Sequence, residues 1–427
     1  MPRSQLYPLI ADAIGTACPT LPDLRAWQQA RLNETIAHAQ RHSRFYAGHL
    51  AGLSGPFTLE SLKALPFTTE RHLADGLEAF LCVPEREVAR IVTLPTSGST
   101  GPPKRIGFSE ADLAATVRFF AAGMREMAGP GQTVMVCLPG TAEDGLLHLL
   151  SKALVQMDVT PLPYGMISRF DDAARFMQAH RPHCIVGLPV QVMGLAAHVA
   201  AHCPTAAAHL SAALMAADHV APSVQARIER DFGCTVFNHY GATEMGYGAS
   251  VDCHCHAGLH LRENDLYFEV VHPTTGDVLG PGEEGELVFT TLTRQAMPLI
   301  RYRTGDAARM LAEPCGCTSP FPRIAAPRRV PHCTLAFGPF SLKLLELDDC
   351  VFAYDAVLDY QLTQRADGAI QLDIWAPPLP EARAQALLAQ LYDAPLTARM
   401  RQHVPLHLAF APSHLPRPCT QGKRIFR

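Results

Sequence analysis

Residues 96–104 read TSGSTGPPK and give the strongest indication of a binding site in this sequence. Glycines allow a backbone to come close to phosphate oxygens, while hydroxyl and main-chain N–H groups donate hydrogen bonds to them. The lysine at the end of the stretch adds a mobile positive charge. The stretch is not a Walker A sequence, because no Gly-Lys-Ser/Thr closes it. It predicts a phosphate-binding loop formed by Thr96, Ser97, Gly98, Ser99, Thr100, Gly101 and Lys104.

The regions around this loop alternate between strand-like and helix-like patterns. Residues 90–94 predict a strand that leads into the loop, and a helix is expected from Ser109 onward. This alternation continues along the chain and is typical of an α/β domain with parallel strands flanked by helices. Strands are expected at residues 133–138, 159–163, 184–188 and 235–238, and helices at residues 23–50, 145–156, 171–180 and in the alanine-rich run 190–217.

After residue 240 the sequence becomes rich in strand patterns. Residues 265–271 and 285–293 predict strong strands separated by a turn. The proline-rich residues 314–329 then predict a domain boundary. We therefore expect a large N-terminal α/β domain with parallel sheets and a β-rich subdomain, residues 1–326, followed by a small C-terminal α+β domain, residues 327–427.

The composition limits the classes of function that this chain can have. The 427 residues are 48% hydrophobic and 18% charged, which is typical of a globular protein and not of a disordered one. Because 36 Lys and Arg nearly balance 40 Asp and Glu, we expect no nucleic-acid partner. No uncharged apolar run reaches the length of about 18 residues that a membrane span requires, so we expect no membrane association. The odd total of 13 cysteines and the lack of a secretory signal pattern favour a cytoplasmic location.

Two further motifs follow the loop in the sequence. Residues 240–244 read YGATE, and residues 302–306 read YRTGD. Taken in this order, the loop and the two motifs resemble those of the adenylate-forming superfamily, which includes acyl-CoA synthetases, luciferases and the adenylation domains of peptide synthetases. A single motif of this kind carries little weight, whereas three in the family's order favour membership of the superfamily.

Shorter segments are similar to those of phenylacetate-CoA ligases in particular. Residues 43–46 and 65–69 are similar to that subfamily's N-terminal SPFY and LPFTTK segments, and residues 297–302 also match it. The resemblance covers residues 24–323 well and the rest of the chain only loosely. It implies an adenylate-forming fold and the activation of a carboxylic acid by ATP.

The resemblance also implies a role for the residues of each motif. The loop at residues 96–104 would hold the β- and γ-phosphates of ATP, Tyr240 would pack on adenine, and Thr243 would bind the α-phosphate. Glu244 would hold Mg²⁺, and Asp306 would accept hydrogen bonds from the ribose hydroxyls. Such a site must screen charge, because joining a carboxylate to ATP brings two anions together. On the residues alone, Tyr240 could equally be a core aromatic and Asp306 a turn-capping residue.

The C-terminal part of the chain matches the family in one element and departs from it in another. Residues 416–423 read PRPCTQGK and are similar to the family's closing element, whose lysine contacts the carboxylate and the α-phosphate; a solvated lysine in a basic tail is the alternative. The family's hinge reads Gly-Arg-x-Asp, whereas residues 326–331 read APRRVP. The missing hinge aspartate and the added prolines call into question the rotation of the small domain. The resemblance thus implies the catalytic residues Lys423, Glu244 and Thr243, and it adds Gly241 and Arg328 to the nucleotide-binding residues.

Two Cys-x-Cys pairs with nearby histidines predict a metal site. In proteins similar to phenylacetate-CoA ligases, a Cys and a Gly-x-His precede a later Cys-x-Cys. The resemblance therefore implies that structural zinc is held by Cys253, His260, Cys315 and Cys317. Metal-free buried thiols are the alternative, and Cys255, His254 and His256 compete as ligands.

The substrate of the reaction is the least defined part of the site. By resemblance, Tyr164, Met166, His239, Met245 and Tyr247 line a pocket for the acid, and they would suit an aryl or arylacetic acid. The same residues could also be ordinary core packing.

We therefore expect an AMP-forming acid–thiol ligase that uses ATP with Mg²⁺ and then coenzyme A. A variant of this reaction stops at the adenylate or passes the acyl group to an acceptor other than coenzyme A. A different class of function is a non-catalytic, zinc-stabilised nucleotide-binding scaffold. Homodimers are usual among similar ligases, although no pattern in this sequence indicates one.

Overall fold

The computed structural model describes residues 3–74, 76–94, 103–329, 333–411 and 417. The chain packs into two compact units. Unit 1 comprises residues 1–130, 140–159 and 237–328, and unit 2 comprises residues 131–139, 160–236 and 329–427. One of the breaks between the units, at residues 328 and 329, lies close to the expected boundary at residue 326. The division into domains 1–326 and 327–427 stays a prediction.

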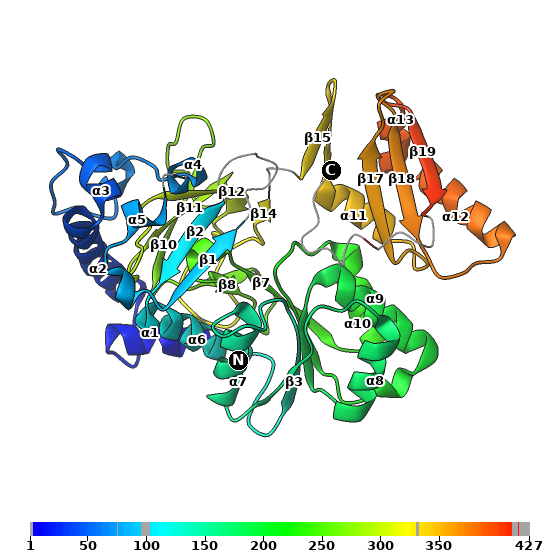
Figure 1. Cartoon of the computed structure of the whole chain (residues 1–427), viewed down its shortest axis with the longest axis horizontal. Helices are drawn as coiled ribbons and strands as arrows, with labels where there is room; N and C mark the ends of the chain where they lie inside the picture. The colour runs from blue at the N-terminus through cyan, green and yellow to red at the C-terminus, as the bar shows by residue number, and fades with distance from the viewer. Residues whose placement is uncertain (1–2, 75, 95–102, 330–332, 412–416, 418–427) are drawn as a thin grey trace. The chain divides into compact units, whose positions relative to one another are not determined.

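Unit 2 contains a parallel sheet of the kind that the sequence predicts. Strands β4, β3, β5 and β6 are neighbours in this order, and each adjacent pair is parallel. Helices α8, α9 and α10 (green in Figure 1) accompany these strands, so that the strands β5 and β6 are buried along their whole length. The α/β fold class is thereby confirmed. These elements are β3 (Thr133–Cys137), β4 (Thr160–Pro163), α8 (Phe170–His180), β5 (Cys184–Gly187), α9 (Pro189–His202), a 3₁₀ helix (Pro204–Ala207), β6 (Ala212–Met215), α10 (Pro222–Phe232) and the beginning of β7 (Thr235–Tyr240).

Two of the predicted helices are wrong in part. The alanine-rich run 190–217 contains α9 but also strand β6, which pairs with β5 in the sheet. A short apolar run that is buried on both faces has no periodicity that separates a strand from a helix, so the high helix propensity of alanine was misleading there. The helix expected at residues 23–50 is divided at Ser43, whose extended backbone ends one helix and whose hydroxyl caps the next.

The C-terminal region of unit 2 shares its hydrophobic core with α10. Val224 and Ile228 of α10 belong to the same buried cluster as Leu347 and Val351 of α11. A three-stranded sheet, in which β18 lies between β17 and β19, extends this cluster. The elements of the region are β15 (Thr334–Phe337), β16 (Phe340–Lys343), α11 (Leu344–Phe352), β17 (Asp359–Gln364), β18 (Ile370–Trp375), α12 (Glu381–Asp393), α13 (Pro395–Arg401) and β19 (Leu406–Phe410).

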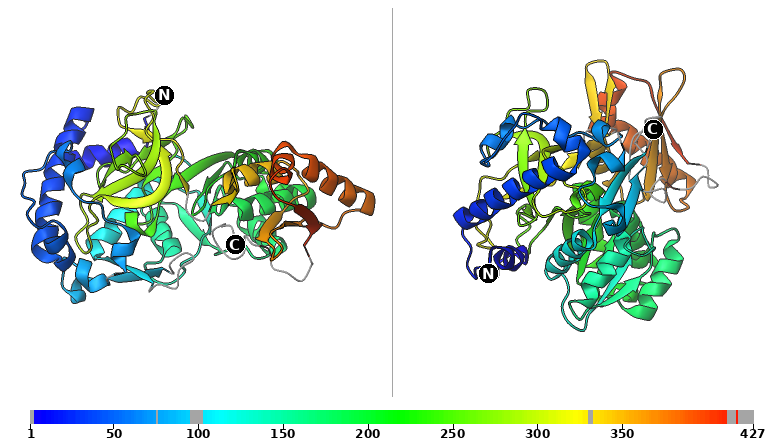
Figure 2. Two further views of the ribbon diagram at one scale, coloured as in Figure 1. Left: turned by 90° about the horizontal axis from the view of Figure 1, so that it is seen from above. Right: turned by 60° about the vertical axis from the view of Figure 1, so that its left-hand side comes forward.

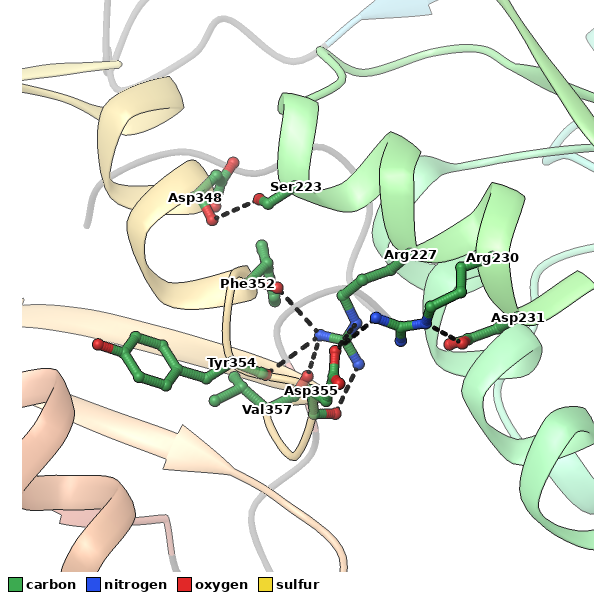
Figure 3. A network of polar contacts seen from close by, with 9 residues as sticks. All are labelled: Ser223, Arg227, Arg230, Asp231, Asp348, Phe352, Tyr354, Asp355 and Val357. Atoms are coloured by element: carbon green, nitrogen blue, oxygen red, sulfur yellow. Dashed lines mark hydrogen bonds and ion pairs between the residues drawn. The ribbon is translucent and has the colours of Figure 1, made fainter.

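A buried arginine, Arg227 of α10, joins the same two regions by hydrogen bonds (Figure 3). Its Nη1 donates to the carbonyl oxygen of Val357 and its Nη2 to that of Asp355, each at 2.8 Å. Longer bonds from Nη1 reach the carbonyl oxygens of Phe352 at 3.4 Å and Tyr354 at 3.5 Å. The carbonyl groups at the end of a helix lack partners within the helix, and one guanidinium can donate to several of them and to the turn that follows.

Replacing Arg227 with Met should loosen this junction. We expect the free energy of opening of α11 to fall by about 3 kcal/mol, because several buried carbonyl groups lose their donor. Amide hydrogen exchange of α11 in the full chain measures this quantity. Arg230→Met is the matched control, since Arg230 is half-exposed and pairs with Asp231 and Asp355 at the surface, and it should cost less than about 1 kcal/mol. Equal effects of the two variants would contradict the proposed anchoring.

Beside this junction, His219 lies between two carboxylates. Its Nδ1 is 3.2 Å from Asp218 and its Nε2 is 2.5 Å from Asp348, which also accepts a hydrogen bond from Tyr360 at 2.6 Å. Burial by itself lowers the pKa of His219, but the two carboxylates outweigh it and raise the pKa to about 10. The imidazolium is therefore charged at neutral pH. Asp218 thus belongs to a mostly buried ion pair.

Unit 1 is built around a four-stranded sheet with the order β10-β11-β12-β14. The expected strands at residues 265–271 and 285–293 are confirmed as β10 and β11, which pair antiparallel with each other. Figure 2 shows this curved sheet in yellow and yellow-green, with the long helix α2 (blue), which packs against β11. Its strands are β10 (Leu266–Val271), β11 (Glu284–Thr291), β12 (Tyr302–Arg309) and β14 (Arg328–Arg329).

Unit 1 also contains antiparallel pairs next to the end of β7, in which β7 pairs with β8, β8 with β9 and β9 with β13. The helix expected from Ser109 onward is α6, which begins with a capping box formed by Ser109 and Asp112. Among the described residues, no helix combines the length and the apolarity needed to cross a membrane. The remaining helices are α1 (Leu6–Ile14), α2 (Leu21–His42), α3 (Arg44–His49), α4 (Glu70–Leu73), α5 (Leu77–Phe80), α6 (Glu110–Met124), α7 (Leu146–Val155) and 3₁₀ helices at Ser61–Ala64, Glu85–Glu87 and Thr243–Met245. The remaining strands are β1 (Arg90–Leu94), β2 (Lys104–Phe108), β8 (Ser250–Val251), β9 (Leu259–Leu261) and β13 (Arg323–Ile324).

Candidate active site

Strands β1 and β2 fix the two ends of the segment that contains the predicted phosphate loop. They pair antiparallel, with Leu94 opposite Lys104. Lys104 is the first residue of β2, and its side chain is mostly buried. The other residues of the predicted loop, which are Thr96, Ser97, Gly98, Ser99, Thr100 and Gly101, lie outside the described residues.

The Lys104 ammonium lies between two carboxylates. Its Nζ is 2.5 Å from Oε1 of Glu244 and 3.0 Å from Oε1 of Glu70. Glu244 is in the 3₁₀ helix Thr243–Met245 that follows β7, and Glu70 begins α4, so three segments far apart in the sequence meet here. Burial by itself lowers the pKa of Lys104, but the two carboxylates outweigh it and raise the pKa above its ordinary value. The amine is therefore protonated and forms a charged cluster with both glutamates.

Glu244 is also held from two other directions. The Tyr302 hydroxyl forms a hydrogen bond with its side chain, and Nη1 of Arg294 donates to its backbone carbonyl oxygen at 2.6 Å. Burial raises the pKa of the Tyr302 phenol well above its ordinary value, and the Glu244 carboxylate adds to this effect. The phenol is therefore protonated and is the donor of the bond to Glu244. The result is a buried carboxylate with a fixed orientation.

The residues Tyr240 and Asp306 of the other two motifs also come together. The Tyr240 hydroxyl donates a hydrogen bond to Oδ2 of Asp306 at 2.7 Å. Asp306 is buried within strand β12, and its N–H donates to the Thr304 hydroxyl at 3.0 Å. A Cβ atom at Gly241 would lie 2.3 Å from the carbonyl oxygen of Tyr247, so only glycine fits after Tyr240 without a shift of the backbone. The geometry does not match a turn-capping role for Asp306, because this residue lies inside a strand.

These groups define the chemistry that unit 1 can perform. A lysine ammonium can bind phosphate, a buried carboxylate can bind a divalent cation, and a second carboxylate can accept hydrogen bonds from paired hydroxyl groups. A nucleotide with its metal ion presents all three of these partners. The arrangement therefore suits a nucleoside triphosphate.

Three residues of the predicted acid pocket belong to unit 1. Met245 is buried, whereas His239 and Tyr247 are partly buried. The Tyr247 ring stacks on Phe108, with 5.7 Å between the ring centroids, and the His239 ring lies 6.1 Å from that of Phe119. Both ring nitrogens of His239 are buried without a hydrogen-bond partner among the described residues. Burial lowers the pKa of His239 to about 4, so its imidazole is neutral.

The other two residues of the predicted pocket, Tyr164 and Met166, belong to unit 2. The Tyr164 ring lies edge-on to that of Phe176, with 5.1 Å between the centroids. Tyr164 also packs against the hydrophobic core of unit 2. Its membership of a pocket for the acid stays a prediction, as does that of Met166.

The two basic residues expected near the C-terminal end of the chain differ in what can be said of them. Arg328 lies in β14, where its guanidinium forms an ion pair with Glu284. The expected contact of Arg328 with ribose stays a prediction. Lys423 lies outside the described residues.

Two residues beside Lys104 and Glu244 could not be recognised in the sequence. Arg294 is buried beside Glu244, and burial lowers its pKa to about 10. It belongs to none of the three motifs, and nothing in the sequence distinguishes it from a surface arginine. Glu70 was missed as well, although it directly follows the segment at residues 65–69 that resembles the subfamily.

The predicted metal ligands gather in a single buried cluster. Ligand atoms of Cys253, His260, Cys315 and Cys317 all lie within 4.8 Å of one another. The sulfurs of Cys253 and Cys315 are 3.7 Å apart, and Cys317 Sγ is 3.4 Å from His260 Nε2. Zn–S bonds of about 2.3 Å in a tetrahedron require S···S distances of about 3.8 Å. The cluster therefore fits a tetrahedral zinc ion.

The alternative ligands lie next to this cluster. Cys255 packs against it, and a second group of three possible ligands consists of Cys253, His254 and Cys255. His256 instead faces a carboxylate, with its Nδ1 3.3 Å from Asp252. The four buried residues form the more complete coordination shell.

Comparisons with known proteins agree with this geometry. The model of the AMP-binding enzyme family matches residues 68–293, which include the loop segment and the Glu244 motif. The phenylacetate-coenzyme A ligase of Thermus thermophilus is 33% identical over 314 residues, which is 70% of this chain and 68% of that ligase. The chain belongs to the AMP-binding enzyme family. The phenylacetate-coenzyme A ligase of Escherichia coli is also similar to this AMP-binding enzyme, at 30% identity over 312 residues, which is 70% of each chain.

A solved structure with the same fold is that of 2-hydroxyisobutyryl-CoA ligase in its postadenylation state, in complex with 2-HIB-AMP. Its TM-score is 0.78 at 18% identity, with 94% of this chain and 87% of that chain covered. The predicted adenylate-forming fold of this AMP-binding enzyme is thus confirmed. The prediction that the chain is an AMP-forming ligase similar to phenylacetate-CoA ligases is also confirmed.

Proposed function

We propose that this AMP-binding enzyme joins a carboxylic acid to the AMP part of ATP with release of pyrophosphate, and then transfers the acyl group to the thiol of coenzyme A with release of AMP. The observation that carries the proposal is the pairing of residues from separate motifs, Lys104 with Glu244 and Tyr240 with Asp306. Acid-dependent exchange of label between pyrophosphate and ATP tests the first step, and detection of acyl-CoA tests the second. Exchange without acyl-CoA favours a different acceptor, and the absence of exchange with every acid of a broad panel favours a non-catalytic scaffold.

In this proposal each motif binds a different part of the nucleotide. Lys104 and the loop before it hold the β- and γ-phosphates, Tyr240 and Gly241 lie along adenine, and Asp306 accepts hydrogen bonds from the ribose hydroxyls. The Tyr240 hydroxyl supports this role because it fixes one oxygen of Asp306. Thr243 binds the α-phosphate. Lys423 stabilises the charge that develops on the transferred oxygens, and Arg328 also contacts ribose.

The described residues fit a magnesium ion at Glu244. Mg²⁺ is usually bound by one or two carboxylates together with phosphate oxygens, and Glu244 is a buried carboxylate beside the expected phosphate site. When bound, Mg²⁺ supplies neutralisation of the negative charge on the phosphates. Glu244 is fixed for this purpose by Tyr302 and Arg294.

For the acid we propose an aryl or arylacetic acid, bound with the help of Met245 and Tyr247. The neutral His239 adds a property that a purely apolar pocket lacks. Its two buried ring nitrogens have no partner among the described residues, and an unpaired buried polar group is unfavourable unless a ligand pairs with it. This favours an acid whose ring carries a hydroxyl or amino group.

Replacing His239 with Phe should therefore change selectivity between acids. We expect kcat/KM for a hydroxy- or amino-substituted aryl acid to fall about tenfold relative to the unsubstituted acid, because one hydrogen bond is lost. Pyrophosphate exchange with both acids measures the ratio. His239→Gln, which keeps a donor and an acceptor, should retain most of it. A ratio that is the same in His239→Phe and in the unchanged enzyme would rule out this role.

We also propose that Cys253, His260, Cys315 and Cys317 hold a structural zinc ion. With three thiolates and an imidazole the shell is closed, so the metal would have no open position for catalysis. It would link the segment after β8 to the segment before β13. None of the twelve described cysteines forms a disulfide bond, and we propose a cytoplasmic location for the enzyme.

A further inference from the structure

We propose that Glu70 is a positioning residue. It holds the Lys104 ammonium when Mg²⁺·ATP binds at Glu244 and Lys104 leaves that carboxylate. This inference rests on the proposed function, in which Glu244 binds the metal and Lys104 binds phosphate. It concerns how Lys104 forms ion pairs first with both carboxylates and then with Glu70 alone.

The starting geometry places both carboxylates within reach of the same ammonium. Lys104 Nζ is 2.5 Å from Glu244 and 3.0 Å from Glu70. The Glu244 side chain is 7% exposed, whereas that of Glu70 is 48% exposed. Glu244 is thus the buried partner, and Glu70 reaches the ammonium from the solvent side.

Lys104 and a magnesium ion compete for Glu244. The ammonium contacts Oε1 of Glu244, and the Tyr302 hydroxyl also bonds to this carboxylate. Mg²⁺ binds oxygen at about 2.0–2.1 Å, and two cations that share one oxygen repel each other. We therefore expect Lys104 to withdraw from Glu244 Oε1 when the metal binds at this oxygen.

Glu70 makes this withdrawal less costly. The Lys104 side chain is only 16% exposed, and an ammonium at such a site is unfavourable without a carboxylate partner. If Lys104 keeps its contact with Glu70, it loses only one of its two partners. The ammonium also stays near the phosphates that it is proposed to bind.

The backbone around Glu70 is built to hold this position. Thr68 N–H donates to the carbonyl oxygen of Arg301 at 3.0 Å, and Arg303 N–H donates to the carbonyl oxygen of Thr68 at 2.9 Å. The Thr68 hydroxyl donates to Ile300 at 2.8 Å. The segment is therefore fixed along the start of β12, where Tyr302 lies. The similar segment of phenylacetate-CoA ligases, LPFTTK, has a lysine at the position of Glu70, so this second carboxylate is a departure from that pattern.

Replacing Glu70 with Gln tests the proposal, because it removes the charge and keeps the shape. We expect the Kd of Mg²⁺·ATP, measured by calorimetry, and its KM in pyrophosphate exchange to rise about fivefold. We expect kcat to change less than about twofold, because Glu70 does not touch the reacting atoms. Glu70→Asp should recover part of the affinity. Thermal melting should be unchanged, since Glu70 is half-exposed.

Glu78→Gln is the matched control. Glu78 is exposed, and it lies 3.5 Å from Arg105, the residue that follows Lys104 in β2. This variant removes the same charge close by without touching Lys104, so its Kd for Mg²⁺·ATP should stay near that of the unchanged enzyme.

The results separate this inference from the proposed function. If Glu70 only repelled the phosphates, Glu70→Gln would bind Mg²⁺·ATP more tightly, and the inference would be wrong. It would also be wrong if Glu70→Gln and Glu78→Gln gave the same Kd. In both cases the unchanged enzyme would still bind Mg²⁺·ATP and exchange pyrophosphate. A lack of binding and exchange in the unchanged enzyme would instead overturn the proposed function.

Discussion

Replacing Glu244 with Gln is expected to lower the rate of acid-dependent pyrophosphate exchange by about 10²–10³-fold. Glutamine fills the same space and can accept a hydrogen bond from Tyr302, but it lacks the charge that a magnesium ion requires. Lys104 would also lose its closer carboxylate, at 2.5 Å, and its position would depend on Glu70 alone. Removing one fixed charge from a buried site at which charge develops typically has an effect of this size.

The measurement is a pyrophosphate exchange assay at saturating acid, repeated over a range of Mg²⁺ concentrations. Circular dichroism and thermal melting show whether the variant is folded. Glu78→Gln again serves as the control for the loss of one carboxylate in unit 1, and it should retain full exchange. An exchange rate in Glu244→Gln within about threefold of the unchanged enzyme would contradict the proposed role of Glu244.

The second large effect is expected at the cysteine cluster. Cys317→Ser should remove bound zinc and lower the free energy of unfolding by at least about 4 kcal/mol, because the energy of a structural metal site contributes directly to folding. Cys317 is fully buried, and its sulfur is 3.4 Å from His260, so a serine hydroxyl would be a poor ligand at the same place. Mass spectrometry of the purified protein measures zinc content, and urea unfolding measures stability.

Cys255→Ser separates the proposed ligand set from the competing one. Cys255 packs against the cluster without belonging to the group of four. We therefore expect this variant to keep about one equivalent of zinc and most of its stability. Loss of zinc in Cys255→Ser but not in Cys317→Ser would show that Cys255, and not Cys317, is the zinc ligand. If the protein without substitutions binds no zinc when it is refolded with the metal, the zinc proposal is wrong and the cluster consists of metal-free buried thiols.

The sequence was most informative where function requires a particular residue at a particular place. The three motifs were expected to bind parts of one nucleotide, a role that stays a prediction, and in the structure Lys104 lies beside Glu244 and Tyr240 beside Asp306. The four predicted zinc ligands also come together. Such motifs are readable because only a few residue types can bind phosphate, a hydroxyl pair or a metal ion.

The sequence was least informative where the surroundings decide the outcome. Strand β6 could not be separated from a helix, because its neighbours in the sheet and not its alanines determine its conformation. Arg294 could not be recognised as a partner of Glu244, because its role depends on burial beside that residue. The contact of Glu70 with Lys104 depends in the same way on the pairing of Thr68 with β12. Tertiary structure supplies these features, and no local pattern encodes them.

The core that α10 shares with α11 has a consequence for how the chain can be divided. If the chain were cut after residue 326, the side of α10 that carries Val224 and Ile228 would lose Leu347 and Val351, which belong to the same buried cluster. Arg227 would at the same time face water without the carbonyl groups that it now binds. The exposed apolar surface would promote aggregation of the shortened protein. Residues 333–411 are therefore part of the same folding unit as the helices of the parallel sheet. Insertions or fusions are better tolerated at the exposed turn around Gly368 than at the junction between the two regions.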